Sequence, residues 1–132
     1  MSHPIMFDDA DPMLARVRDL TLAFPGAGEK ISHGRPAFYT RKVFAYFGGS
    51  IKVGGGYVSH DQAVMVKADP VEAPALIEEP GCFVPAYLGP SGWLGFDLHE
   101  HTDWGWISDL VETSYRLTAG KRLIAELDAQ QR

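Results

Sequence analysis

Basic side chains gather in the middle of the chain. Between residues 30 and 67 stand six basic residues and one acid, Asp61, although the whole chain of 132 residues has 17 Asp and Glu against 12 Lys and Arg. Lys and Arg neutralise phosphates, and the release of counterions then supplies affinity for nucleic acid. The pattern predicts non-enzymatic binding of double-stranded DNA through Lys30, Arg35, Arg41, Lys42, Lys52 and Lys67. Alternatively, these charges protect the exposed edges of a β-sheet.

A second set of residues has the chemistry of a small-molecule pocket. Aromatic rings with a few polar groups are typical of such pockets, and rings beside a guanidinium suit a flat aromatic or an anionic ligand. The alternative function is therefore the binding of a metabolite or drug in an aromatic cleft. Its predicted residues are His33, Arg35, Phe38, Tyr46, Tyr87 and Trp93. A simpler interpretation is that these aromatic residues belong to the core.

Metal and catalytic chemistry have weaker support. His99 and His101 alternate, so both imidazoles would share one side of a strand, with Asp97 and Asp103 nearby. Polar residues are also typical of a connection between a strand and a helix, so we predict no metal site. Cys82 lacks a histidine partner by spacing and is expected to be an inert thiol. The chain carries no P-loop and no Gly-x-Ser-x-Gly motif, and we expect neither catalysis nor a cofactor.

The first element that the sequence predicts is a helix over residues 11–24. Asp11 suits the N-cap and Pro12 the first helical position. Apolar residues then recur at three- and four-residue spacing, at Met13, Leu14, Val17, Leu20 and Phe24. We expect residues 1–10 to be a flexible N-terminus and residues 11–132 to form a single domain.

Four short strands are expected next, within residues 31–33, 37–39, 43–47 and 62–67. Short Gly-rich turns favour an antiparallel meander. Gly48-Gly49 and Gly54-Gly55-Gly56 bracket residues 51–53 in a flexible hairpin. The strand over residues 62–67 is apolar on both faces, which predicts a central position in the sheet.

The second half of the chain adds helices and one more strand. A mid-chain helix is expected to begin at Pro70, with Asp69 as its N-cap, or at Pro74, and to end near residue 79. An aromatic stretch over residues 83–95 is too interrupted by Gly and Pro for a helix, and it returns the chain to the sheet as a strand over residues 93–98. Helices over about 103–118 and 121–130 follow. The predicted fold class is α/β (α+β), an antiparallel sheet with four helices packed on it.

Several blocks of this sequence resemble the MmcQ/YjbR family. They are FPGAGEKISHGRPAFY at 24–39, VKADP at 66–70, YLGPSGW at 87–93 and SYRL at 114–117. The resemblance spans residues 11–125 and implies a CyaY-like α/β fold. It also implies a "double wing" DNA-binding arrangement, in which β-hairpins flank the contact surface. Within these blocks we expect a structural ion pair between Glu29 and either Arg35 or Arg116.

Hydropathy and the N-terminal residues indicate where the chain works. No apolar run approaches the roughly 18 residues that a membrane-spanning helix needs. The first residues, MSHPIMFDD, lack the basic and apolar regions of a signal peptide. We therefore expect a cytoplasmic protein without a membrane partner.

Overall fold

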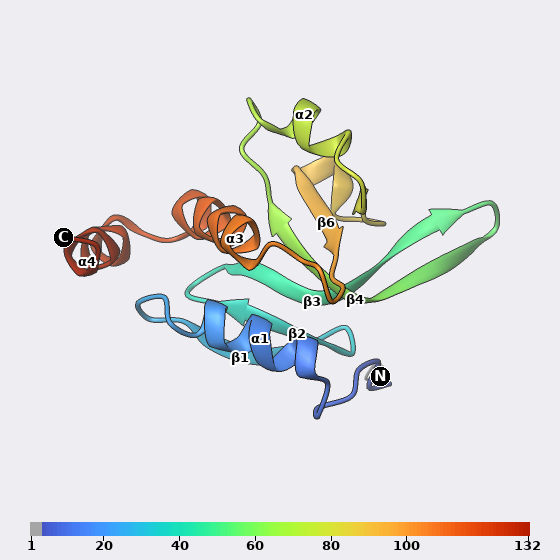
Figure 1. The fold of residues 1–132 in the computed structure, drawn as a ribbon, viewed down its shortest axis with the longest axis horizontal. Coiled ribbons are helices and arrows are strands. Elements are labelled where there is room, and N and C mark those ends of the chain that lie inside the picture. The colour runs from blue at the N-terminus through green and yellow to red at the C-terminus, as the bar shows by residue number, and fades with distance from the viewer. Residues whose placement is uncertain (1–3) are drawn as a thin grey trace.

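A six-stranded antiparallel sheet forms the centre of the computed structural model, which describes residues 4–132 (Figure 1). The strand order is β1-β2-β3-β4-β6-β5. The strands are β1 (Gly28–Ser32), β2 (Arg35–Tyr39), β3 (Val43–Val53), β4 (Gly56–Lys67), β5 (Cys82–Phe83) and β6 (Trp93–Asp97). The apolar strand over residues 62–67 belongs to β4, which pairs with β3 and β6, so its predicted central position is confirmed.

The helices among the described residues are α1 (Pro12–Thr21), α2 (Ala73–Ile77), α3 (Trp104–Thr118) and α4 (Lys121–Gln130), with a 3-10 turn, η1 (Gly89–Ser91). Two predicted caps are confirmed, because Asp11 accepts from the Met13 amide and Asp103 from the Trp106 amide. The mid-chain helix follows its later predicted start. Asp69 instead closes a turn by accepting from the Val71 amide at 2.8 Å.

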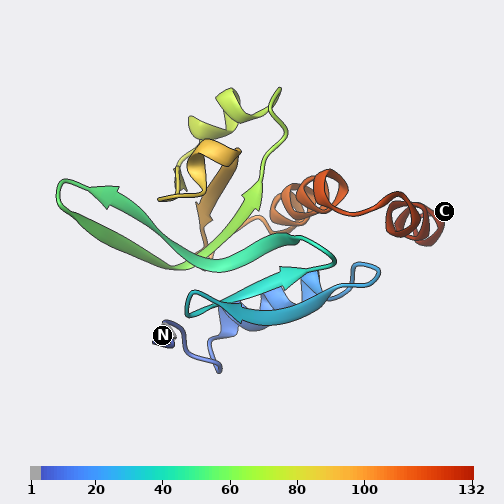
Figure 2. The same ribbon diagram turned by 180° about the vertical axis from the view of Figure 1, so that it is seen from behind.

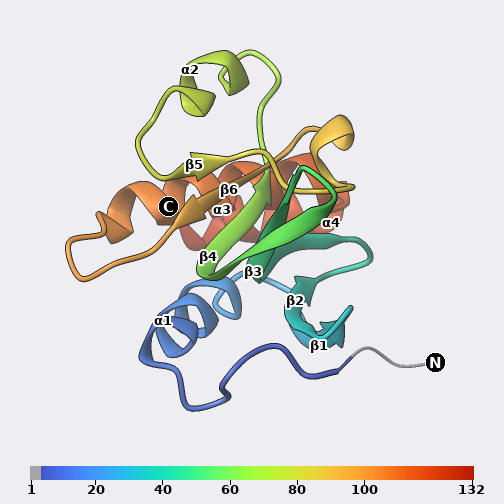
Figure 3. The same ribbon diagram turned by 90° about the vertical axis from the view of Figure 1, so that its right-hand side faces the viewer.

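All four helices contribute to one core cluster on a single face of the sheet. Figure 3 shows α3 behind β4 and β6. Ser114 on α3 fastens this layer, because its hydroxyl donates to the Phe44 carbonyl at 2.6 Å and accepts from the Lys67 amide at 2.9 Å. Tyr115 stacks on Phe24 and donates its hydroxyl to the Pro25 carbonyl at 2.7 Å. Burial raises the pKa of Tyr115. This face is therefore closed and well packed.

The β3–β4 hairpin extends beyond the sheet as an arm, which we define as residues 50–59 (Figures 1 and 2). The sequence predicts a strand only from residue 62, but β4 begins at Gly56. Residues 56–59 read Gly-Tyr-Val-Ser, so they lack the alternation of apolar and polar residues that identifies a strand. The ladder with β3 forms them into a strand, and a bulge between Phe47 and Gly49 interrupts that ladder.

The turn between β1 and β2 lies against the residues that precede α1. His33 and Gly34 take φ values of 53° and 82°, so His33 lies in a two-residue turn and not in the first strand as expected. The Met6 amide donates to the Gly34 carbonyl at 2.9 Å, and Phe7 packs against the helix-side core. Residues 1–3 of the predicted flexible segment lie outside the described residues. Within residues 4–132, no helix has the length and apolar character needed to cross a membrane.

Candidate ligand-binding cleft

A cleft of about 650 Å³ lies on the sheet face opposite the helices. Four segments surround it: Met6 before α1, the β1–β2 turn with the start of β2, strands β3 and β4, and residues 84–92, which we call the connector. The lining residues include Ser32, His33, Arg35, Tyr46, Tyr57, Ser59, Met65, Ala86, Tyr87 and Leu88. This volume is within the range of small-molecule sites, and the mixture of aromatic and polar side chains is typical of them.

Arg35 is the buried charge of this cleft. Successive residues of a strand point to opposite faces, so Arg35 lies on the same side of β2 as Ala37, whose neighbour on β3 is Tyr46 of the cleft. Only 7% of the Arg35 side chain is exposed. Its Nη2 donates to the Ser59 hydroxyl at 3.3 Å and pairs with Asp61 at 3.2 Å. Its buried Nη1 has no hydrogen-bond partner among the described residues.

Gly48 makes room for this guanidinium. It belongs to the β3 bulge and has a φ of 83°, a value that favours glycine. A Cβ atom at this position would overlap Nη1 of Arg35. The backbone of β3 therefore approaches Arg35 more closely than any residue with a side chain would permit, and this approach covers the guanidinium.

Tyrosines form the walls of the cleft at two depths. Tyr46 lies at the base, where its ring meets Trp93 edge to face with centroids 5.4 Å apart. Tyr57 and Tyr87 lie at the surface, with stacked rings 6.0 Å apart and hydroxyls hydrogen-bonded to each other. This bond is the main cause of the raised pKa of Tyr87.

The connector both lines the cleft and is fixed to the sheet. Trp93, the first residue of β6 directly after the connector, is buried in a small cluster with Ala63, Met65 and Phe83. The Ala86 amide donates to the Ser50 carbonyl of β3 at 2.8 Å, which ties the connector to the arm. Because this tie holds Ala86, Tyr87 and Leu88 beside the sheet, the connector encloses the cleft.

The structure brings four of the six predicted ligand residues to this cleft. His33, Arg35, Tyr46 and Tyr87 line it. Phe38 does not, because the alternation of β2 turns it to the helix-covered face, where it is fully buried. Trp93 supports the cleft from behind Tyr46 and is 8% exposed.

The six predicted DNA-binding residues lie in separate places. Lys30 is on edge strand β1, with its ammonium 4.8 Å from the centre of the Tyr39 ring. Arg41 and Lys42 occupy the exposed β2–β3 turn, and the half-buried Lys67 lies at that end of the sheet. Lys52 is near the tip of the arm, roughly 30 Å along β3 from Lys42 at about 3.3 Å per residue. The sixth, Arg35, is the buried cleft residue.

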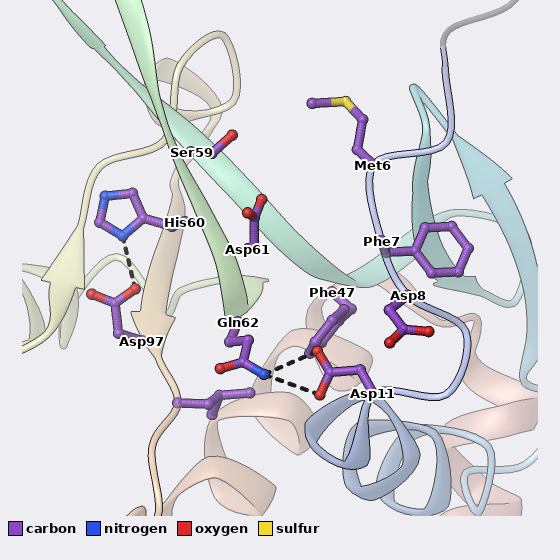
Figure 4. A pocket seen from close by; sticks show the side chains of 11 residues that line it. Met6, Phe7, Asp8, Asp11, Phe47, Ser59, His60, Asp61, Gln62 and Asp97 are labelled. Carbon is purple, nitrogen blue, oxygen red and sulfur yellow. Dashed lines mark hydrogen bonds and ion pairs between the residues drawn. The ribbon is translucent and has the colours of Figure 1, made fainter.

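A second hollow, of about 790 Å³, adjoins the cleft and is lined by acids (Figure 4). Two pairs of its side chains bond to each other, and Asp61 bonds to Arg35. Gln62 donates to both oxygens of Asp11, at 3.1 and 3.0 Å, and His60 Nδ1 lies 2.7 Å from Asp97. Across residues 4–132 no group of three or more His, Cys, Asp or Glu side chains is arranged to hold a metal ion.

The residues considered for metal or thiol chemistry have structural contacts. His99 Nδ1 accepts from the backbone amide of His101 at 3.0 Å, within the loop before α3. Burial is the main cause that raises the pKa of Cys82 to about 11, with further contributions from Asp97 and Glu79. The Cys82 thiol is therefore protonated at neutral pH.

The expected ion pair of Glu29 with Arg35 or Arg116 is wrong. Glu29 pairs with Arg18 of α1 at 2.9 Å. Glu29 is opposite Phe38 in the β1–β2 ladder and shares its helix-covered face, whereas Arg35 lies on the other face. Arg116 pairs with Asp128 of α4 at 2.8 Å. Proximity in the sequence favours Arg35 as the partner of Glu29, but the two side chains lie on opposite faces of the sheet and cannot pair.

Several cleft residues were missed from the sequence, among them Tyr57, Ser59 and Met65. A signal was present, because these residues stand at alternate positions of one strand and therefore share a side. It was missed because the strand was expected to start only at residue 62. Asp61, counted as the one acid in the basic segment, is the partner of its most buried base.

Comparison with known proteins agrees with this fold. The YjbR family model matches residues 22–117, which is most of the chain. The chain belongs to the YjbR family. No curated protein matches this YjbR-family chain. The predicted family resemblance is confirmed, and the predicted CyaY-like and double-wing character stays a prediction.

Two solved structures are similar to this YjbR-family protein. A Pseudomonas syringae protein has a TM-score of 0.60 and 16% identity, with 83% of this chain and 99% of that chain covered. Deinococcus radiodurans protein DR2400, a DUF419 domain, has a TM-score of 0.61 and 17% identity, with 89% and 91% covered. At these identities the similarity shows the fold, which is the predicted α+β class.

Proposed function

We propose that this YjbR-family protein binds a small, flat, anionic organic molecule in the cleft. The observation that supports this most strongly is Arg35, which is 7% exposed and yet lines a cavity of about 650 Å³. A guanidinium screened from water interacts more strongly with an anion than an exposed one does. Tyr46, Met65 and Leu88 add an apolar surface on which a ring can pack.

Asp61 provides a way for a ligand anion to reach Arg35. The Asp61 side chain is 68% exposed, so it returns to water at little cost when another anion takes its place. Its departure leaves the buried guanidinium in need of a partner, and a buried charge is strongly stabilised by one. A carboxylate or phosphate on the ligand meets that need.

Calorimetric titration with 2-naphthoate tests the proposal. Wild type is expected to bind it more tightly than 2-naphthalenemethanol, which has the ring without the charge. Ala86→Trp fills the cleft and should weaken binding by about tenfold or more, which is about 1.4 kcal/mol. Ser91→Trp, on an exposed residue of the same connector, is the matched control and should bind like wild type. No binding at millimolar concentration, or equal binding by Ala86→Trp, would disprove the proposal.

We propose binding without catalysis. The protonated Cys82 thiol supports this, because thiolate is the nucleophilic form. We also propose that the protein works in the cytoplasm, where a single unpaired cysteine is ordinary. Incubation of a bound ligand with the protein should return that ligand unchanged by mass spectrometry.

Double-stranded DNA remains the second candidate, favoured by Lys52, which is exposed on the projecting arm (Figure 1). Such an arm could place Lys52 against a phosphate without the rest of the sheet. A gel shift at low salt should then be lost in Lys52→Glu and kept in Lys121→Glu, whose charge is on α4. Absence of a shift with wild type would end this candidate.

A further inference from the structure

We propose that Tyr57 and Tyr87 form a gate at the mouth of the cleft, and that a flat ring of the ligand enters between their two rings. This inference rests on the proposed function of the cleft. Tyr57 belongs to β4 on the arm and Tyr87 to the connector, so two separate segments carry the halves of the gate. Their rings are stacked with centroids 6.0 Å apart and planes 29° apart, and their hydroxyls bond to each other.

The backbone conformation of Tyr87 is strained, and packing of its side chain does not explain that strain. Its φ of 65° is in the left-handed region, which is unfavourable for a residue with a bulky side chain. Burial does not offset this strain, because the residue is 81% exposed. Strained residues of this kind cluster at ligand clamps and switch regions. Here the strained conformation places the Tyr87 ring opposite Tyr57.

The spacing of the rings fits a gate that opens slightly. A flat ring in contact with both tyrosines needs about 7 Å between their centroids, at about 3.5 Å for each contact. The present 6.0 Å is about 1 Å short of this. The arm is the segment that supplies the movement, because it projects beyond the sheet and the bulge between Phe47 and Gly49 interrupts its ladder at the base. Opening breaks the bond between the hydroxyls and frees both for the edge of the ligand.

Lys52 specifies the charge of the ligand. It is the cross-strand neighbour of Tyr57 on the arm and is exposed. Its positive charge acts on Tyr87, where it opposes the rise in the pKa. A ring held in the gate therefore has a lysine beside its outer edge and Arg35 inside the cleft. The ligand class that fits is a flat aromatic ring system with acidic groups on its edge.

The same 2-naphthoate titration, repeated with gate variants, tests this inference. Tyr57→Ala and Tyr87→Ala should each weaken binding about tenfold, because each removes one stacking surface. Tyr87→Gly relieves the backbone strain and should lose the same affinity. Val58→Ala is the matched control, since Val58 is an exposed apolar residue of the arm that does not line the cleft, and it should bind within about twofold of wild type.

Two further measurements separate stacking from a general structural role. Proton NMR of 2-naphthoate should show upfield ring-current shifts with wild type that both alanine variants reduce. Tyr57→Phe and Tyr87→Phe keep the rings and remove the hydroxyl bond, so stopped-flow mixing should show faster association. If Ala86→Trp abolishes binding but both alanine variants bind like wild type, the cleft is a binding site and the gate is refuted. If wild type does not bind, the proposed function fails, and the gate with it.

Discussion

The two faces of the sheet hold their aromatic side chains in different ways. On the helix-covered face, Phe24, Phe44 and Tyr115 contact one another at centroid distances of 4.8 to 6.0 Å, and the Tyr115 side chain is fully buried. On the open face, Tyr57 and Tyr87 stack in solvent, with exposures of 53% and 81%. The same residue type therefore belongs to a closed core on one side and to an accessible surface on the other.

This difference separates stability from binding. A buried ring contributes transfer free energy and dispersion contacts to folding. An exposed ring contributes little to folding and remains able to contact a ligand. We therefore expect substitutions on the helix-covered face to lower the free energy of unfolding, and substitutions at Tyr57 and Tyr87 to change ligand affinity with little effect on folding.

Truncation of Tyr115 should give the largest effect. Tyr115→Ala removes a fully buried ring and its hydrogen bond to the Pro25 carbonyl, and should lower the free energy of unfolding by about 3–5 kcal/mol. Tyr87→Ala is the matched change on the open face and should cost less than about 1 kcal/mol. Urea unfolding measures both. A similar loss of unfolding free energy in both variants would contradict the division of the sheet into a stabilising face and a binding face.

A substitution at Gly48, beside Arg35 on the open face, should lower the free energy of unfolding by an intermediate amount. Gly48→Ala puts a Cβ at a φ of 83° and against the Arg35 guanidinium, and should cost about 2 kcal/mol. Gly55→Ala, at the open tip of the arm, should change stability by less than about 0.5 kcal/mol. Thermal unfolding compares the two. A tolerated Gly48→Ala would mean that Arg35 is less tightly held than its burial indicates.

The smallest effect concerns Cys82, which packs at the edge of the helix-side core. Its pKa of about 11 predicts that iodoacetamide alkylation accelerates through pH 11, and not near pH 9 as for an ordinary thiol. Folding favours the protonated thiol, so its contribution to stability is complete below pH 9. That contribution is lost as pH rises through 11. Mass spectrometry measures the alkylation. A profile centred near pH 9 would show that the Cys82 thiol at the edge of the helix-side core is accessible to water.

Local patterns predicted the elements well. Asp11 and Asp103 are caps because a carboxylate near free amides acts within one turn of its own helix. The sequence predicts the hairpin around residues 51–53, but it does not predict that the second strand of that hairpin begins at Gly56. The second strand of the arm has no apolar alternation of its own and forms by pairing with residues 50–53 across the hairpin turn, and the two-residue β5 forms by pairing with β6.

The candidate site was predicted only in part, for the same reason. Residue type predicts Arg35 and Tyr87 as ligand residues, and both line the cleft. Residue type predicts Phe38 equally, but Phe38 lies on the other face of the sheet. A residue type indicates what a side chain can do, whereas the register of β2 decides which face it reaches.

The family, the α+β class and most helix boundaries can be predicted from the amino-acid order, because they depend on motifs, caps and periodicities within a few residues. The folded chain is needed to see that Arg35 pairs with Asp61, 26 positions away, and that Tyr57 bonds to Tyr87 at the mouth of the cleft. These contacts depend on a bulge, a turn with positive φ and the pairing of distant strands. Each of these follows from packing of the whole chain, and no short stretch of sequence contains that information.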